Sequence, residues 1–175
     1  MKVLDKNFKV FISQEQIAQR VKELGEMISK DYQDKNPLFI SVLNGSFVFT
    51  ADLMRELDIL PQVSFIKVSS YEKMSSTGSV KEHIGLNENV FNRHLILVED
   101  IVDTGNTIVK LYEMFKELGP ASIEVASALL KPEAYKKEIN VKYVGFEIPN
   151  KFVLGYGLDY DGYGRNLKDI YQLAE

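Results

Sequence analysis

Apolar residues follow two patterns along this chain, and the two patterns alternate. Some segments are apolar or strand-like runs of the kind found in strands buried in a parallel sheet. These runs are residues 38–43, 63–71, 94–98, 122–130 and 141–148. In other segments apolar side chains recur every three or four positions, which predicts helices. The helical segments are residues 13–33, 47–57 and 108–118. Strands that alternate with helices predict an α/β fold with a mostly parallel, twisted sheet flanked by helices.

Sequence signals mark the ends of two of the helices. Ser13 with Gln16 has the pattern of a capping box at the start of the first helix. The dipeptide Gly119-Pro120 stops the last one. We find no internal repeat and no linker, so residues 1–175 are predicted to form a single domain.

Two segments have neither pattern. Residues 72–90 are polar and aperiodic, and residues 155–166 form a loop rich in Gly and Tyr. Long aperiodic loops in compact domains are usually functional or disordered. We therefore predict that residues 72–83 form a lid that closes over a reacting centre.

Composition excludes several classes of function. The net charge is −4 and no run of Lys or Arg forms a basic stripe, so nucleic acid is not an expected partner. The chain has no cysteine, which excludes a disulfide framework, a thiolate zinc site and a cysteine nucleophile. Neither a signal peptide nor a membrane-spanning run is visible, so we expect a cytoplasmic protein without a membrane partner.

The segment 95–107, LILVEDIVDTGNT, places three acids beside a turn that has the composition of a phosphate cradle. A helix that starts there offers free backbone N–H groups and its positive dipole end to an anion. Gly105 permits close approach of the backbone, and the hydroxyl groups of Thr104 and Thr107 add donors.

The acids of this segment require a different partner, because carboxylates only accept hydrogen bonds. A ribose diol offers two adjacent donors, and a divalent ion such as Mg²⁺ satisfies carboxylate and diol oxygens together. A sugar phosphate therefore fits both halves of the segment. The alternative is that Asp103 or Thr104 caps a helix and that Glu99 and Asp100 are solvated loop acids.

The segment VEDIVDTGNT resembles the signature of type I phosphoribosyltransferases, in which two acids, an apolar pair and D-T-G-x-T form the phosphoribosyl diphosphate loop. Four other segments are similar to the hypoxanthine-guanine branch of that family and follow in its order. They are VLNGSF (42–47), SSYEKMSSTG (69–78), LLKPE (129–133) and YVGFEIPNKFVLGYGLDYDGYGRNL (143–167). The resemblance covers about residues 5–173 and implies a small hood formed by the N- and C-terminal segments.

The resemblance implies a role for each residue of the acidic segment. Glu99 and Asp100 would contact the ribose hydroxyls and the first Mg²⁺, and Asp103 would be the general base near purine N7. The 5′-phosphate would be bound by the segment that contains Thr104, Gly105, Asn106 and Thr107.

It also implies a purine subsite and a diphosphate subsite. Lys131 would donate to the 6-oxo group, Phe152 would stack on the base, the Val153 backbone would read its edge, and Asp159 would be the second Mg²⁺ ligand beside the purine. The implied diphosphate-binding residues are Leu43, Asn44, Gly45, Ser70, Tyr71 and Arg165, with a cis peptide bond preceding the second of them. Asn44 departs from the pattern, since relatives often have Lys or Arg there.

The expected activity is transfer of the 5-phosphoribosyl group from phosphoribosyl diphosphate to N9 of hypoxanthine and guanine, with Mg²⁺ as cofactor, in a homodimer or homotetramer. One alternative is a non-catalytic regulator of the same fold that senses phosphoribosyl diphosphate. Another is the same reaction with xanthine as the main base. Asp103 and Lys131 favour catalysis over regulation, and Lys131 favours a 6-oxopurine over adenine.

Overall fold

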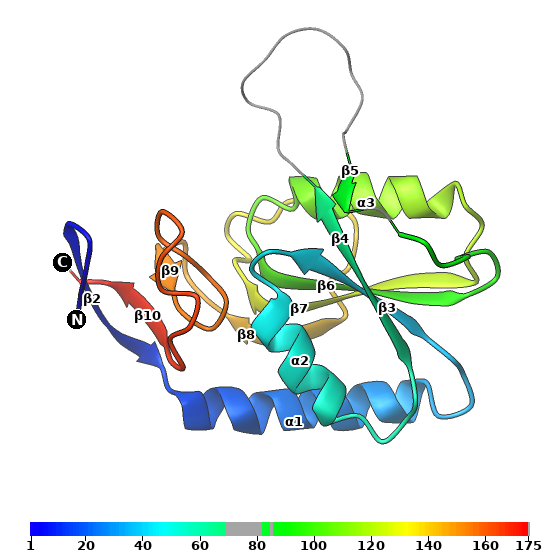
Figure 1. Cartoon of the computed structure of the whole chain (residues 1–175), viewed down its shortest axis with the longest axis horizontal. Coiled ribbons are helices and arrows are strands. Elements are labelled where there is room, and N and C mark those ends of the chain that lie inside the picture. Colours follow the sequence, from blue (N-terminus) through cyan, green and yellow to red (C-terminus); the bar gives the residue numbers. More distant parts are fainter. Residues whose placement is uncertain (69–81, 85, 175) are drawn as a thin grey trace, which may run out of the picture.

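The computed structural model describes residues 1–68, 82–84 and 86–174, and its centre is a six-stranded sheet (Figure 1). The strand order is β5-β4-β3-β6-β7-β8. Five strands are parallel, namely β3 (Leu38–Leu43), β4 (Gln62–Val68), β6 (His94–Val102), β7 (Ser122–Leu130) and β8 (Tyr143–Glu147), and β5 (Glu82–Ile84) runs antiparallel to β4. The predicted α/β class is confirmed.

Helices cover both faces of this sheet (Figure 1). The long helix α1 (Gln14–Asp31) and α2 (Phe47–Arg55) lie on one face, and α3 (Asn106–Lys116) lies on the other. Successive strand side chains point to opposite faces. Phe39 therefore packs with α1 and α2, whereas its neighbours Leu38 and Ile40 pack with α3. The apolar runs in the sequence are uninterrupted because these strands are buried on both faces.

The first helix begins as predicted. The Ser13 hydroxyl accepts from the Gln16 backbone at 3.3 Å, and the Gln16 side chain accepts from the Ser13 backbone at 2.9 Å. The reciprocal pair forms the capping box that the sequence indicated.

The hood is a separate antiparallel sheet, of order β1-β2-β10-β9, built from the two ends of the chain (Figure 1). Its strands are β1 (Lys2–Val3), β2 (Lys6–Ile12), β9 (Val153–Leu154) and β10 (Ile170–Leu173). Buried Phe8 of β2 contacts the rings of Phe152 and Tyr160 at centroid distances of 6.2 and 6.1 Å. The predicted hood is confirmed, although its strands were not recognised individually.

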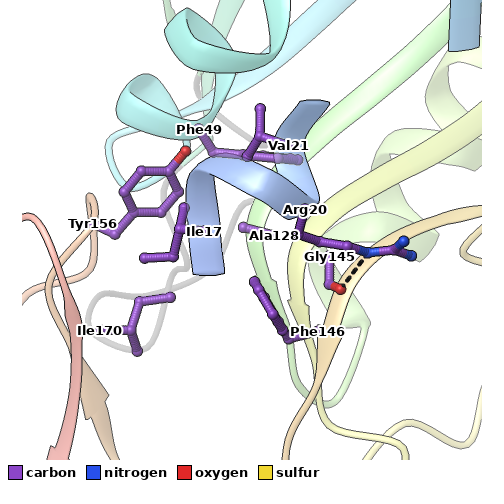
Figure 2. Close-up of a pocket in the computed structure, with 9 residues that line it drawn as sticks. All are labelled: Ile17, Arg20, Val21, Phe49, Ala128, Gly145, Phe146, Tyr156 and Ile170. Atoms are coloured by element: carbon purple, nitrogen blue, oxygen red, sulfur yellow. Dashed lines mark hydrogen bonds between the residues drawn. The ribbon is translucent and has the colours of Figure 1, made fainter. Parts of the chain in front are cut away.

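A cavity of about 10 Å³ lies between α1, the sheet and the hood (Figure 2). Its lining includes Ile17, Ala128 and Ile170, and at this size it holds at most about one water molecule. The Arg20 side chain lines it beside β8, where Nε donates to the Gly145 carbonyl at 2.9 Å and Nη2 to the Val144 carbonyl at 2.8 Å.

Strand boundaries differ from the prediction in one place that matters for function. The strand predicted to end at residue 98 continues as β6 to Val102, because it stays paired with β7 as far as Val102 opposite Leu130. The predicted lid falls mostly on residues 72–81, which lie outside the described part of the chain. No helix among the residues that the structure describes is long and apolar enough to span a membrane.

Candidate active site

The first two acids of the site lie inside the C-terminal half of β6. Glu99 pairs in register with Ser127 of β7, and its side chain is buried. Burial, with the neighbouring Asp100 charge, holds the Glu99 pKa well above its usual range, and burial also raises the pKa of Asp100. Neither is a solvated loop acid, so that alternative is wrong.

The segment after β6 forms the start of α3. Gly105 occupies the N-cap position with a φ of 79°, and no side chain caps the helix there. The alternative that Asp103 or Thr104 is the helix cap is therefore wrong as well. A Cβ on Gly105 would also lie 2.2 Å from the ring of Tyr135. Glycine is required here by the backbone angle and by the close approach of that ring.

This turn leaves donors available to an anion. The first four N–H groups of a helix have no intrahelical acceptor, and the Val109 N–H is the first to bond back, to the Gly105 carbonyl at 3.0 Å. The side chains of Thr104, Asn106 and Thr107 are exposed beside these groups. Free N–H groups at a helix N-terminus suit an anion, and phosphate binding at this turn stays a prediction.

Asp103 and Lys131, to which the resemblance assigns the roles of base and purine donor, are in contact. The Lys131 ammonium donates to Oδ2 of Asp103 at 2.7 Å, with the lysine buried and the carboxylate half-exposed. The Lys131 backbone N–H donates to the Val102 carbonyl at 2.9 Å, which fixes the end of β7 against the end of β6. An acceptor and a donor therefore stand side by side at the carboxyl edge of the sheet, where α/β folds bind ligands.

The predicted diphosphate loop follows β3, and its Leu43–Asn44 peptide bond is cis, as the resemblance implies. Gly45 lies directly against Asp100, since a Cβ on Gly45 would be 1.5 Å from Asp100 Oδ2. Behind the loop, the buried Ser41 hydroxyl bonds to the hydroxyls of Ser46 and Thr50 at 2.7 and 2.8 Å. Sequence reasoning did not identify this hydroxyl network, because its members read as isolated polar residues.

Residues 155–169, between β9 and β10, form the hood loop. Two of its residues, Asp159 and Arg165, form an ion pair in which Oδ1 and Nη2 are 2.7 Å apart. Both act on Asp100: the Arg165 charge favours the ionised form of that carboxyl, and the Asp159 charge opposes it. The hood loop thus brings its charges toward the acids of β6.

Phe152 is 45% exposed, so its ring is not part of the hydrophobic core. Its ring and that of Tyr160 pack in a T-shaped pair, with centroids 5.7 Å apart and an interplanar angle of 81°. Val153 is buried in β9, opposite Gln172 of β10. Ser70 and Tyr71 lie outside the described residues.

The family described as the phosphoribosyl transferase domain matches residues 12–161. This chain belongs to the phosphoribosyltransferase family. A hypoxanthine-guanine phosphoribosyltransferase of Streptococcus pneumoniae (strain ATCC BAA-255 / R6) is 42% identical over 168 residues, which cover 95% of this chain and 93% of that protein.

Two solved structures extend the likeness of this phosphoribosyltransferase. A hypoxanthine-guanine phosphoribosyltransferase from Bacillus anthracis, with a HEPES molecule in its active site, has a TM-score of 0.88 at 37% identity and covers 97% of this chain and 100% of its own. A hypoxanthine phosphoribosyltransferase from Trypanosoma cruzi has a TM-score of 0.88 at 38% identity, covering 99% and 95%. The resemblance seen in the sequence is confirmed.

The buried acids of this phosphoribosyltransferase predict a pH-dependent stability. Because the Glu99 pKa is raised on folding, the folded state binds more protons than the unfolded chain above the ordinary value of 4.5. The free energy of unfolding should therefore decrease as the pH rises from about 4.5 through the raised pKa of Glu99. Glu99→Gln, which mimics the protonated acid, should make this decline shallower and leave the variant more stable at high pH.

Urea unfolding between about pH 5 and 8 measures this effect. Glu26→Gln, on the exposed face of α1, is the matched control and should reproduce the native profile. Parallel profiles for the native protein and Glu99→Gln would contradict the expectation.

Proposed function

We propose that this phosphoribosyltransferase transfers the 5-phosphoribosyl group from phosphoribosyl diphosphate to N9 of hypoxanthine and guanine, giving IMP or GMP and diphosphate. The observation that carries the proposal is the Asp103–Lys131 ion pair of 2.7 Å beside the Gly105 turn. A carboxylate acceptor next to an ammonium donor fits a flat ring that offers one N–H and one oxygen. A 6-oxopurine offers both, whereas the 6-amino group of adenine is itself a donor.

Asp103 acts as the general base in this scheme. It accepts the proton from purine N7, N9 forms the bond to the anomeric carbon of the ribose, and the bond from that carbon to the diphosphate oxygen breaks. Lys131 donates to the 6-oxo group. Its ammonium stabilises the negative charge that develops on the purine as N7 loses its proton. The exposed ring of Phe152 stacks on the base, and the Val153 backbone reads its edge.

The phosphoribosyl group is held on two sides. Backbone N–H groups and hydroxyls from Thr104 to Thr107 bind the 5′-phosphate, and Glu99 and Asp100 accept from the ribose hydroxyls. The leaving diphosphate is bound by Arg165 and by the backbone donors of Leu43, Asn44 and Gly45. Ser70 and Tyr71 would complete this subsite.

The carboxylates fit Mg²⁺. Glu99 and Asp100 are adjacent, and none of the ion pairs in the described part of the chain includes either of them. Mg²⁺ is usually held by one or two carboxylates plus substrate oxygens, and these two adjacent acids supply that number. Glu99 and Asp100 would hold one ion and Asp159 a second, and the metal would neutralise charge on the diphosphate.

The same proposal covers the organisation of the molecule. Residues 1–175 act as one domain, because the hood and the parallel sheet both supply residues to the site. We propose a cytoplasmic homodimer or homotetramer. Support for the oligomer comes from the Trypanosoma cruzi relative, in which the C-terminal region was studied for its role in oligomeric state.

Magnesium-dependent synthesis of IMP from hypoxanthine tests the proposed reaction. Turnover should be lost with excess chelator and restored by added Mg²⁺. Initial rates with guanine, xanthine and adenine in the same assay rank the bases. Equal turnover with chelator would contradict the role of the metal. Binding of phosphoribosyl diphosphate without turnover of any base would favour the regulator, and fastest turnover of xanthine would favour the other alternative.

A further inference from the structure

The backbone of the hood packs closely against the backbone of the diphosphate loop at Gly157. Gly157 is buried, has a φ of 99°, and a Cβ built on it would lie 2.1 Å from the Gly45 carbonyl oxygen. The other side of Gly45 meets Asp100. Gly157, Gly45 and Asp100 thus form a three-layer contact stack that runs from the hood, through the loop, to the acids of β6.

Hydrogen bonds fix Gly157 on the hood side of this stack. Its N–H donates to the Arg165 carbonyl at 3.0 Å, and its carbonyl accepts from Arg165 Nη1 at 2.7 Å. The preceding residue, Tyr156, is buried, and its N–H donates to the Leu167 carbonyl at 2.9 Å. The hood backbone at this point is a firm surface against which the loop rests.

A second connection holds the same segment to the helix that follows the loop. The Tyr156 hydroxyl donates to Oδ2 of Asp52 on α2 at 2.9 Å. The α2 helix begins at Phe47, two residues after Gly45. The hood therefore contacts the loop at Gly157 and is tied to the element behind the loop by the Tyr156–Asp52 bond.

From these contacts we infer that Gly157 and the Tyr156–Asp52 pair are positioning residues that set where the diphosphate loop sits relative to the base-binding hood. The inference rests on the proposed function, because it assigns the loop to diphosphate and the hood to the purine. One continuous segment contains Phe152, Val153 and Gly157. A shift of this segment would therefore move both the base and the diphosphate loop. A methyl group at Gly157 displaces the Gly45 carbonyl, since close-packed backbone leaves no room for it.

The hood loop provides a matched control for this test. Gly162 also has a positive φ, 84°, but a Cβ built on it meets no atom within 4 Å. Gly157→Ala and Gly162→Ala therefore share the backbone strain of alanine in this region. Only the first places an atom against the diphosphate loop.

The experiment measures binding of inorganic diphosphate with Mg²⁺ by calorimetry, and the KM values for phosphoribosyl diphosphate and hypoxanthine. Gly157→Ala should weaken diphosphate binding by about tenfold or more. It should raise the KM for phosphoribosyl diphosphate more than that for hypoxanthine. Gly162→Ala should keep both within about threefold of the native values. Equal losses in the two variants, or no loss in Gly157→Ala, would overturn the inference.

Tyr156→Phe provides a second, milder variant if Gly157→Ala does not fold. It keeps the buried ring and removes only the bond to Asp52. We expect a higher KM for phosphoribosyl diphosphate with a nearly unchanged KM for hypoxanthine, and equal changes or none would overturn the inference. A native protein that makes no IMP would refute the proposed function. Calorimetry with diphosphate needs no turnover, so the comparison of variants would still test the positioning role of Gly157 and Tyr156.

Discussion

Replacing Asp103 with Asn should lower kcat by about 10²- to 10⁴-fold, the usual loss when a general base is removed. The amide cannot accept the purine proton near neutral pH. It can still accept a hydrogen bond from Lys131, whose Nζ lies 2.7 Å from the present carboxylate. Because Asp103 is not the cap of α3, the helix should be unaffected.

Steady-state and single-turnover rates of IMP formation measure this loss, with circular dichroism to check the fold. Asp34→Asn, at an exposed position after α1, is the matched control and should leave kcat unchanged. A near-normal kcat in Asp103→Asn would show that the carboxylate only pairs with Lys131.

Replacing Lys131 with Gln should erode the preference for 6-oxopurines over adenine. The ammonium only donates, whereas an amide can present either a donor or an acceptor to position 6 of the base. Sites that require a specific hydrogen bond discriminate by up to ~10⁴-fold. The ratio of kcat/KM for hypoxanthine to kcat/KM for adenine should therefore fall substantially. The backbone bond from Lys131 to the Val102 carbonyl remains, and β7 should keep its place beside β6.

Competition between hypoxanthine and adenine in one reaction measures the ratio directly. Lys110→Gln, on the exposed side of α3, removes the same charge away from the purine and should not change selectivity. An unchanged ratio in Lys131→Gln would mean that another group reads position 6.

The sequence predicted the parts of this site whose chemistry is local. The acids, the Gly105 turn and the strand before them are contiguous, so their order alone indicated a phosphate beside a diol. The length of β6 was missed because acids ordinarily end a buried run, whereas here pairing with β7 carries the strand through Glu99 and Asp100. That pairing depends on residues almost 30 positions away, which no local pattern contains.

The sequence also showed no sign of the contacts that glycines make with residues far away in the chain. Gly105 lies under Tyr135, and Gly157 lies against Gly45 more than 100 positions earlier in the chain. Glycine in a polar segment reads as a flexible turn, and only the packed structure shows that two of these turns have no room for a side chain. Two of the hood strands, β1 and β9, were missed for another reason: each has only two residues, too few for a period to be seen.

The guanidinium of Arg20 has a consequence for the edge of the parallel sheet. Because β8 is the last strand of the parallel sheet, its outer side is a template on which a foreign strand could form, the usual route to edge-to-edge aggregation. The Arg20 guanidinium bonds to two carbonyls of this strand, those of Val144 and Gly145. A charged side chain bound at an edge strand is one of the features by which natural sheets discourage such edge-to-edge pairing.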